Sequence, residues 1–277
     1  MRQKGDFNFA QMLSRLHTAD HSPDDIEVLK SKIISRASEH YPKTALHIFP
    51  TRADVESHNS SLLNAQPEEK VDIVAITKYP RVLKNYDCSQ VVGGLCHHLR
   101  LCKNARIMLV KNLDVADGLV NGATGIILDI LHNEQSSPMP KALIVKFDNR
   151  NIGRLARQSS KISLQSYKDG VPILPVEVKQ NAGRSDTSPE ITRIQFPVVL
   201  CWACTIHKVQ GQTLDNVVIS FKRLRTKGQA YVAFSRITSL RGLFLLDFNA
   251  DAIKKDNSVS EEMTRLRNEK SIHLFFR

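Results

Sequence analysis

The sequence contains no long run of apolar residues. None approaches the roughly 18 consecutive apolar residues that a membrane-spanning helix needs. The N-terminal residues MRQKGDFNF also lack the apolar core of a secretory signal. These absences argue against a membrane protein and against a secreted one. We therefore expect an intracellular protein with no membrane partner.

Cysteine is scarce as well. The five cysteines among 277 residues are an odd number, which fits reduced thiols better than a disulfide framework. Three of them surround two histidines, in the set Cys88, Cys96, His97, His98 and Cys102. The spacings match no common zinc finger, and no second Cys-x-x-Cys knuckle follows. A zinc site is therefore the weaker interpretation, and we expect no metal.

The remaining cysteines, Cys201 and Cys204, form a CWAC sequence inside the apolar run VVLCWAC. A Cys-x-x-Cys spacing also occurs in redox motifs. The apolar flanks favour a buried strand instead, in which small thiols pack in the core.

Basic residues exceed acidic ones. Lys and Arg total 39 against 28 Asp and Glu, which gives a formal charge of +11 and a pI near 9.5. Such an excess favours polyanionic partners through phosphate neutralisation, although charge alone also serves solubility. With 42% hydrophobic and 24% charged residues, the chain has an ordinary globular composition.

Strand and helix patterns alternate over much of the chain. Helical spacing of apolar residues marks residues 7–37, and the run ALHIF predicts a buried strand before a helix that Thr51 caps. VDIVAITKY predicts the next strand, and FPVVLCWA, NVVISF and LFLLDF predict strands after residue 196. This alternation is typical of an α/β fold with a parallel sheet.

Short β-rich runs interrupt the alternation, with a tight turn at Asn121-Gly122. They predict a small inserted β-barrel with a long mobile loop. We therefore expect an α/β domain that is divided by an insertion. The predicted parts are helices at 1–40, the α/β domain at 41–104 and 197–250, the inserted barrel at 105–196 and a C-terminal tail at 251–277.

The loop TIHKVQGQTL leaves a predicted buried strand at its C-terminal end, where α/β sheets usually place ligands. Thr205, His207 and Lys208 supply a hydroxyl, a ring and a cation suited to a phosphodiester backbone. Gln210 beside Gly211 lets the backbone approach a bound anion. An ordinary polar loop is the alternative interpretation.

A second segment, GQAYVAFSR, predicts a helix that begins at Gly228 and carries Tyr231, with Arg236 near its end. An arginine at a rigid helix end can stabilise charge on a transferring γ-phosphoryl group. A surface salt bridge is the ordinary alternative for a lone arginine.

Both segments closely resemble motifs V and VI of the PIF family of superfamily 1 DNA helicases, relatives of RecD. IFPTRADVESHN resembles motif IV, and NLDVADGLVNGATGIILDI resembles the barrel insertion of that family's second motor domain. MRQKGDFNFAQMLSRLH resembles the segment that follows motif III at the end of the first motor domain. The resemblance implies a RecA-like parallel sheet, of the P-loop NTPase superfamily, with an inserted barrel like that of Src-homology-three domains.

The resemblance also implies an activity. Family members use ATP and Mg²⁺ to move 5′ to 3′ on single-stranded DNA and to part forked duplexes, G-quadruplexes or RNA:DNA hybrids, in DNA repair, recombination and telomere maintenance. It implies a location in the nucleus or the mitochondrion.

Residue roles follow from the resemblance by position. Arg236 is the expected γ-phosphate arginine, and Arg52 is an expected second phosphate contact. The expected nucleotide-binding residues are Gln210, Gly211, Gln229 and Arg236, and the expected strand-binding residues are Thr205, His207 and Lys208. Gln229 and Tyr231 are expected to orient the helix before Arg236, and residues 119–124 either line the DNA path or close the barrel.

The sequence departs from the family pattern in several places. None of its 12 glycines precedes a lysine, and no Asp-Glu dipeptide occurs, so it has neither a P-loop nor the usual acid pair. Val209 stands where family members more often carry Ser. We expect ATP and Mg²⁺ to be bound mainly by a first motor domain absent from this sequence, and the isolated chain to be inactive. A first motor domain supplied in trans is one expected partner. The alternatives are a nucleic-acid-binding module without catalysis and a barrel that binds protein.

Overall fold

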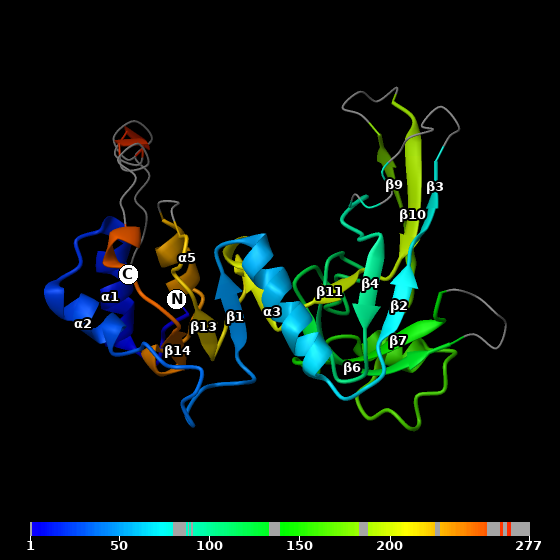
Figure 1. Cartoon of the computed structure of the whole chain (residues 1–277), viewed down its shortest axis with the longest axis horizontal. Coiled ribbons are helices and arrows are strands. Elements are labelled where there is room, and N and C mark those ends of the chain that lie inside the picture. The colour runs from blue at the N-terminus through cyan, green and yellow to red at the C-terminus, as the bar shows by residue number, and fades with distance from the viewer. Residues whose placement is uncertain are drawn as a thin grey trace. The chain divides into compact units, whose positions relative to one another are not determined.

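The chain folds into two compact units in a computed structural model (Figure 1). The structure describes residues 2–79, 87, 89, 91–132, 139–182, 188–224, 228–253, 261–262 and 265–266. The first unit comprises residues 1–55 and 203–277, and the second comprises residues 56–202. Within the described residues, no helix has both the length and the apolar character needed to cross a membrane.

The first unit is built on a four-stranded sheet in which every neighbouring pair is parallel. Its strands are almost entirely buried, as expected of parallel strands that are covered on both faces. This arrangement confirms the predicted α/β class with a parallel sheet. In spatial order the strands are β12 (Ala203–Thr205), β1 (Leu46–Phe49), β13 (Val217–Ile219) and β14 (Leu243–Leu245).

Short helices complete this unit. Helix α1 buries one apolar stripe, formed by Phe9, Ala10, Met12, Leu13 and Leu16, which matches helical periodicity. The helices are α1 (Phe7–Thr18), α2 (Pro23–Lys30) and α5 (Gln229–Phe234), with 3₁₀ turns η2 (Ile206–Val209), η3 (Leu240–Gly242) and η4 (Ala250–Ala252). Helix α3 (Arg52–Ala65) begins in the first unit and continues into the second.

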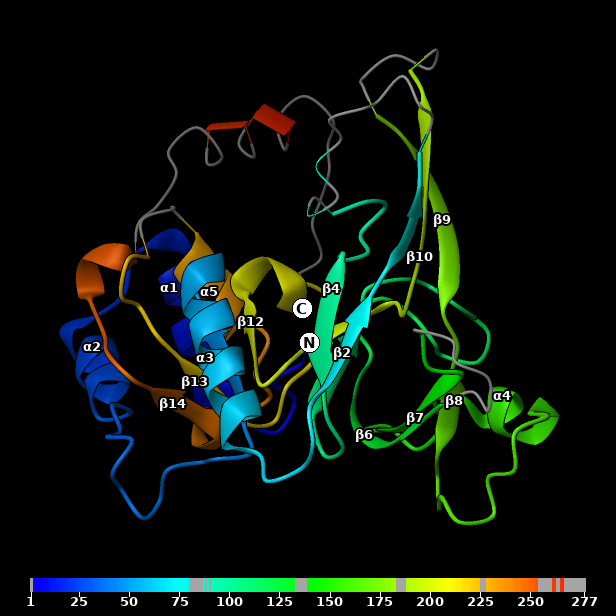
Figure 2. The ribbon, with the colours of Figure 1, turned by 45° about the vertical axis from the view of Figure 1, so that its right-hand side comes forward.

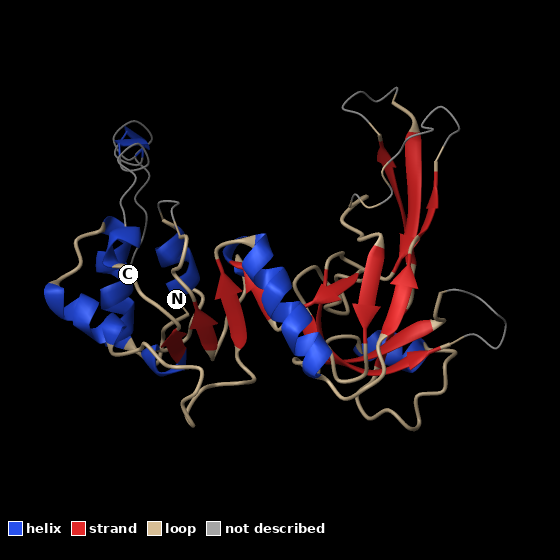
Figure 3. Ribbon diagram, in the orientation of Figure 1, coloured by secondary structure: helices blue, strands red, loops and turns tan. Residues whose placement is uncertain are grey.

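The second unit consists mainly of antiparallel strands (Figure 3). Its five-stranded sheet contributes half of the buried residues of a hydrophobic core, against which the single tryptophan, Trp202, packs half-buried. In order, that sheet contains β11 (Val198–Leu200), β5 (Arg106–Leu109), β6 (Thr124–Leu131), β7 (Ala142–Phe147) and β8 (Val171–Ile173). An antiparallel sheet therefore occupies the region where the sequence predicted a barrel.

Two smaller sheets and one short helix complete the second unit. The strands β3, β10 and β9 run side by side as a ribbon (Figure 2). The remaining elements are β3 (Ile76–Lys78), β10 (Glu190–Gln195), β9 (Val176–Asn181), the pair β2 (Val71–Val74) and β4 (His98–Leu101), and α4 (Arg154–Ser159).

The strands in VDIVAITKY were predicted correctly but were assigned to the wrong sheet. VDIVAITKY does form strands, but β2 pairs antiparallel with β4 and lies outside the parallel sheet. Only Ile73 of β2 is buried, because one face of this pair is open to solvent, as is common in antiparallel sheets.

The two compact units also divide the chain differently from the predicted domains. The breaks fall after residues 55 and 202, where the sequence placed them after 104 and 196. Helices α1 and α2, predicted to derive from a first motor domain, belong to the same compact unit as the parallel sheet. Residues 183–187 of the predicted mobile loop and most of the tail at 251–277 lie outside the described residues.

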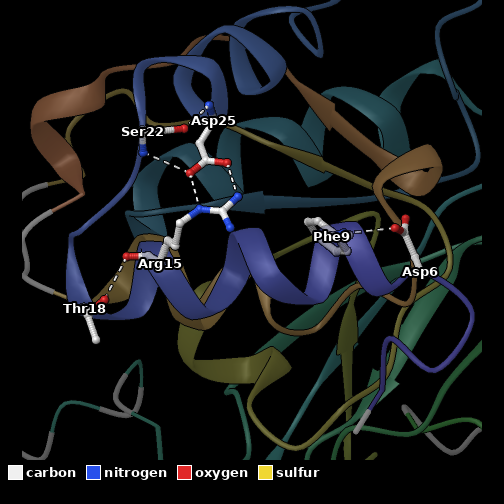
Figure 4. A network of polar contacts seen from close by, with 6 residues as sticks. All are labelled: Asp6, Phe9, Arg15, Thr18, Ser22 and Asp25. Carbon is white, nitrogen blue, oxygen red and sulfur yellow. Dashed lines mark hydrogen bonds and ion pairs between the residues drawn. The ribbon is translucent and has the colours of Figure 1, made fainter.

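A buried carboxylate joins α1 to α2 (Figure 4). Arg15 donates to both oxygens of Asp25, at 2.8 and 2.6 Å, and the backbone N–H of Ser22 donates to the same carboxylate at 3.0 Å. The Ser22 hydroxyl in turn accepts from the Asp25 N–H, which completes a capping box at the start of α2. The hydrogen bonds from Arg15 lower the pKa of Asp25 to about 2.

Replacing this carboxylate tests its contribution. Asp25→Asn should lower the free energy of unfolding at neutral pH by about 1–3 kcal/mol, because charge-assisted hydrogen bonds are lost in a buried place. The pKa of Asp25 is depressed on folding, so the contribution is complete above the ordinary value of about 3.9. It is lost as the pH falls toward the folded value of about 2. Urea unfolding at several pH values measures both effects. Asp24→Asn, an exposed neighbour, is the control; equal losses in the two variants would contradict the assignment.

Candidate nucleic-acid interface

The loop after β12 separates apolar anchors from polar side chains. Thr205 ends β12, and the 3₁₀ turn η2 follows directly. Ile206 and Val209 are buried, whereas His207 and Lys208 are exposed. The buried pair fixes the turn on the core and leaves the ring and the ammonium in solvent. Because Val209 is 0% exposed, a hydroxyl there would not reach a strand in solvent, so the departure from Ser removes no contact.

The next two residues offer an open stretch of backbone. Gln210 and Gly211 are both exposed. Gly211 has a φ of 85°, a conformation that L side chains rarely adopt, and a Cβ at this position would meet nothing within 4 Å. The glycine is therefore required by backbone conformation, and the space beside it is accessible to a ligand.

Arg236 follows helix α5, as the sequence predicted. Gly228, with a φ of 76°, precedes the helix, and Ser235 caps its C-terminal end. The half-buried Arg236 folds back on this end: Nη2 donates to the Ser235 hydroxyl at 2.8 Å and Nε to the Val232 carbonyl at 3.1 Å. Among the described residues its guanidinium has no carboxylate partner, so its charge is not neutralised by an ion pair.

Backbone hydrogen bonds hold the two segments together. Leu214 N–H donates to the Arg236 carbonyl at 2.9 Å, and Thr238 N–H donates to the Leu214 carbonyl at 3.0 Å. These bonds form a parallel bridge between Leu214 and Ile237. The chain that leaves Gly211 therefore runs beside Arg236, although the two lie far apart in sequence.

The structure adds Arg2, which sequence reasoning missed. Its Nε donates to the Thr213 hydroxyl at 3.2 Å and its Nη2 to the Gly211 carbonyl at 3.4 Å. Burial, together with the positive charge of Arg2, lowers the pKa of Arg236. An arginine still keeps its proton at neutral pH. Two guanidinium groups thus share one region, which favours a bound anion.

Gln3 was missed too, and it supports the backbone around Arg236. Its side chain is 7% exposed, and Nε2 donates to the carbonyls of Ile237 at 2.6 Å and Ser235 at 3.4 Å. These two carbonyls flank Arg236. Asp6 adds a second attachment by accepting from the Leu240 N–H at 3.0 Å. The segment that contains Gln3 and Asp6 therefore fixes the chain that carries Arg236.

Other predicted residues lie nearby or elsewhere. Gln229 is the half-buried first residue of α5, and the ring of Tyr231 lies 4.5 Å from that of His17 on α1. Arg52 is the exposed first residue of α3, and no contact among the described residues joins it to Arg236. The structure thus brings together Arg236 and the loop at Gly211, and the role of Arg52 stays a prediction.

The remaining sequence interpretations concern cysteines and the 119–124 segment. Among the described residues no group of three or more His, Cys, Asp or Glu side chains is arranged to hold a metal. Cys88 is not among the described residues. Cys201 and Cys204 are buried thiols. Leu119 and Ala123 belong to the core of the second unit, which favours closure of the fold over contact with DNA.

Comparison with known proteins agrees with these features. Residues 88–130 match the family model for the 2B domain of the DNA helicase Pif1. The ATP-dependent DNA helicase PIF1 of Danio rerio is 32% identical over 226 residues, which cover 82% of this chain and 31% of that protein. The chain belongs to the Pif1 family. It spans about a third of the length of the curated relatives it matches, from 31% to 38% in the Danio rerio and Xenopus laevis proteins.

Solved structures support the fold. The crystal structure of Pif1 helicase from Candida albicans superimposes with a TM-score of 0.70 at 26% identity, covering 97% of this chain and 59% of that one. Bacteroides Pif1 bound to single-stranded DNA gives a TM-score of 0.68 at 22% identity, covering 98% and 56%. These likenesses confirm the RecA-like parallel sheet.

Gln3→Leu tests the support around Arg236. The variant should leave the Ile237 carbonyl without its donor and lower the free energy of unfolding by about 1–3 kcal/mol. Amide hydrogen exchange should increase locally, at Thr238 and Leu214 above all. Gln11→Leu changes the same side chain at an exposed position of α1 and is the control. Unchanged exchange at both amides would contradict the role given to Gln3.

Proposed function

We propose that this chain is the second-motor-domain part of a 5′-to-3′ DNA helicase, which couples ATP hydrolysis to movement along single-stranded DNA and to duplex unwinding. The observation that carries the proposal is the bridge at Leu214, which joins the exposed loop of Lys208 to the chain of Arg236. One surface can therefore sense a nucleotide and hold a strand. The relatives' name, ATP-dependent DNA helicase, and the DNA-bound Bacteroides structure support it.

The strand-binding part of the proposal rests on Thr205, His207 and Lys208. Thr205 ends β12, and His207 and Lys208 follow it, at the carboxyl end of a strand, where parallel sheets usually bind ligands. The ammonium and the ring are in solvent, where a phosphodiester can reach them. Forked duplexes and G-quadruplexes are the further DNA partners that we propose from the family resemblance.

The nucleotide-binding part rests on Arg236, with Arg2, Gln210 and Gly211 beside it. Arg236 now donates to a hydroxyl and a carbonyl, and a phosphate oxygen forms stronger, charge-assisted bonds. Exchange of the neutral acceptors for a γ-phosphate is therefore favourable. ATP and Mg²⁺ would be held mainly by a P-loop motor domain, in the same protein or in trans, because this sequence has no Gly-Lys pair.

Finer assignments belong to the same proposal. We assign Arg52 as a second phosphate contact and Gln229 as a residue that orients α5. The antiparallel sheet of the second unit is the Src-homology-three-like barrel of the motor domain. Roles in repair, recombination and telomere maintenance, in the nucleus or mitochondrion, follow from the family resemblance.

A nucleic-acid-binding module without catalysis is the second candidate, because the sequence has no P-loop. ATPase assays on the chain alone and together with a Pif1 first motor domain separate the two functions. Stimulation by that domain supports the helicase, and binding of DNA without stimulation supports the module.

Lys208→Ala tests the strand contact. The variant should bind oligothymidylate more weakly, and the slope of log K against log salt should decrease by about 0.7, the value for one lost phosphate contact on a single strand. Fluorescence anisotropy at several salt concentrations measures this slope. Lys161→Ala removes an exposed lysine in the second unit and should leave the slope unchanged. An unaltered slope in Lys208→Ala would remove this residue from the interface.

Arg236→Ala tests the nucleotide contact in a protein that joins this chain to a P-loop motor domain. The kcat for ATP should fall about 10³- to 10⁵-fold, as for other arginines that stabilise phosphoryl transfer. Binding of single-stranded DNA should persist, and Arg241→Ala, at an exposed position, is the control. Loss of ATPase and DNA binding together would indicate misfolding and count against the assigned role.

A further inference from the structure

The first unit contains a pocket that none of the predicted site residues lines. Its volume is about 470 Å³, large enough for a small ligand. It lies where three neighbouring strands of the parallel sheet end: Phe49 is the last residue of β1, Ser220 follows β13 and Leu246 follows β14. Open α/β sheets bind ligands outside the carboxyl ends of their strands. The position therefore suits a binding site.

The two carboxylates in the pocket wall already have donors for all their oxygens. Asp247 accepts from the Ser220 hydroxyl at 2.6 Å and from the Phe221 N–H at 2.7 Å. Asp54 accepts from the Thr51 hydroxyl at 2.6 Å and pairs with Arg223 at 3.5 Å. Arg223 therefore offsets the charge of Asp54, whereas Asp247 has only neutral donors and keeps its negative charge in the wall.

Two cations of the same wall have no such partners. Arg36 and Lys222 reach the pocket from segments far apart in sequence, and both are exposed. In the part of the chain that the structure describes, neither side chain forms a hydrogen bond or an ion pair. With Arg223 paired to Asp54, the two cations Arg36 and Lys222 face one remaining acid, Asp247, so the wall keeps a small positive excess. The hydroxyl group of Ser35 adds an uncharged donor beside it, whereas the proton of the Ser220 hydroxyl already goes to Asp247.

We propose that this pocket binds a phosphate group between Arg36 and Lys222. This phosphate site is distinct from the Lys208 loop. That loop follows the edge strand β12, whereas Lys222 follows β13, and β1 lies between these two strands. Both sites lie at the carboxyl ends of strands in one sheet, where strands are spaced about 4.8 Å apart. The phosphate can belong to a DNA backbone or to a free nucleotide. The site stands on residues other than those of the proposed function, so either can fail alone.

Titration of the 277-residue chain with inorganic phosphate tests the site. In NMR spectra, amide signals of Ser35, Ser220 and Lys222 should shift at constant ionic strength. The double variant Arg36→Gln/Lys222→Gln should weaken phosphate binding at least about tenfold, or about 1.4 kcal/mol. The charge-preserving variant Arg36→Lys/Lys222→Arg should keep most of the affinity, and Lys161→Gln should keep all of it. Unchanged affinity in the first double variant, or shifts confined to the Lys208 loop, would overturn the proposal.

Competition identifies the source of the phosphate. Displacement by oligothymidylate, with a smaller salt slope in the double variant than in the unaltered chain, assigns the pocket to the DNA backbone. Displacement by ADP but not by the oligonucleotide assigns it to a nucleotide. Displacement by neither refutes a biological phosphate site. Lys208→Ala, measured in parallel, separates this result from a failure of the strand-binding loop.

Discussion

The bridge between Leu214 and Ile237 is the constraint on which the interface depends. Two backbone hydrogen bonds place the chain after Gly211 against the chain that carries Arg236. They add to the packing of α5 against the 3₁₀ turn η2, which the buried residues Ile206 and Val209 anchor in the core. Gln3 and Asp6 reinforce the same place through backbone groups on either side of Arg236.

That constraint has an electrostatic cost. Arg2 and Arg236 carry like charges in a partly buried region, and the lowered pKa of Arg236 reflects both burial and this repulsion. A bound anion removes the repulsion and replaces neutral acceptors with charged ones. Binding energy is thus available to a ligand with negative charge and not to a neutral one, which gives selectivity without any change in the backbone.

The sequence predicted those features that depend on local pattern. The parallel strands are short apolar runs buried on both faces, and the loop after β12 was correctly placed at a strand end. The partner of β2 was not predictable in the same way. A strand's own residues indicate that it pairs, but its neighbour is decided by long-range packing and register.

The missed residues have a common physical reason. Arg2 and Gln3 act on backbone carbonyls more than 200 positions away, and a carbonyl leaves no signature in the amino-acid sequence. The pocket between Arg36 and Lys222 is likewise assembled from separate segments. Val209 shows the opposite case, since its departure from the family pattern looked relevant until its burial was known.

The position of the single tryptophan makes tryptophan fluorescence a probe of one unit more than of the other. Trp202 packs on the core of the second unit. The first unit contains tyrosines but no tryptophan. Indole emission therefore reports mainly on the packing of the antiparallel half. Circular dichroism senses both halves, so a gap between the two signals on heating would reveal that they unfold independently.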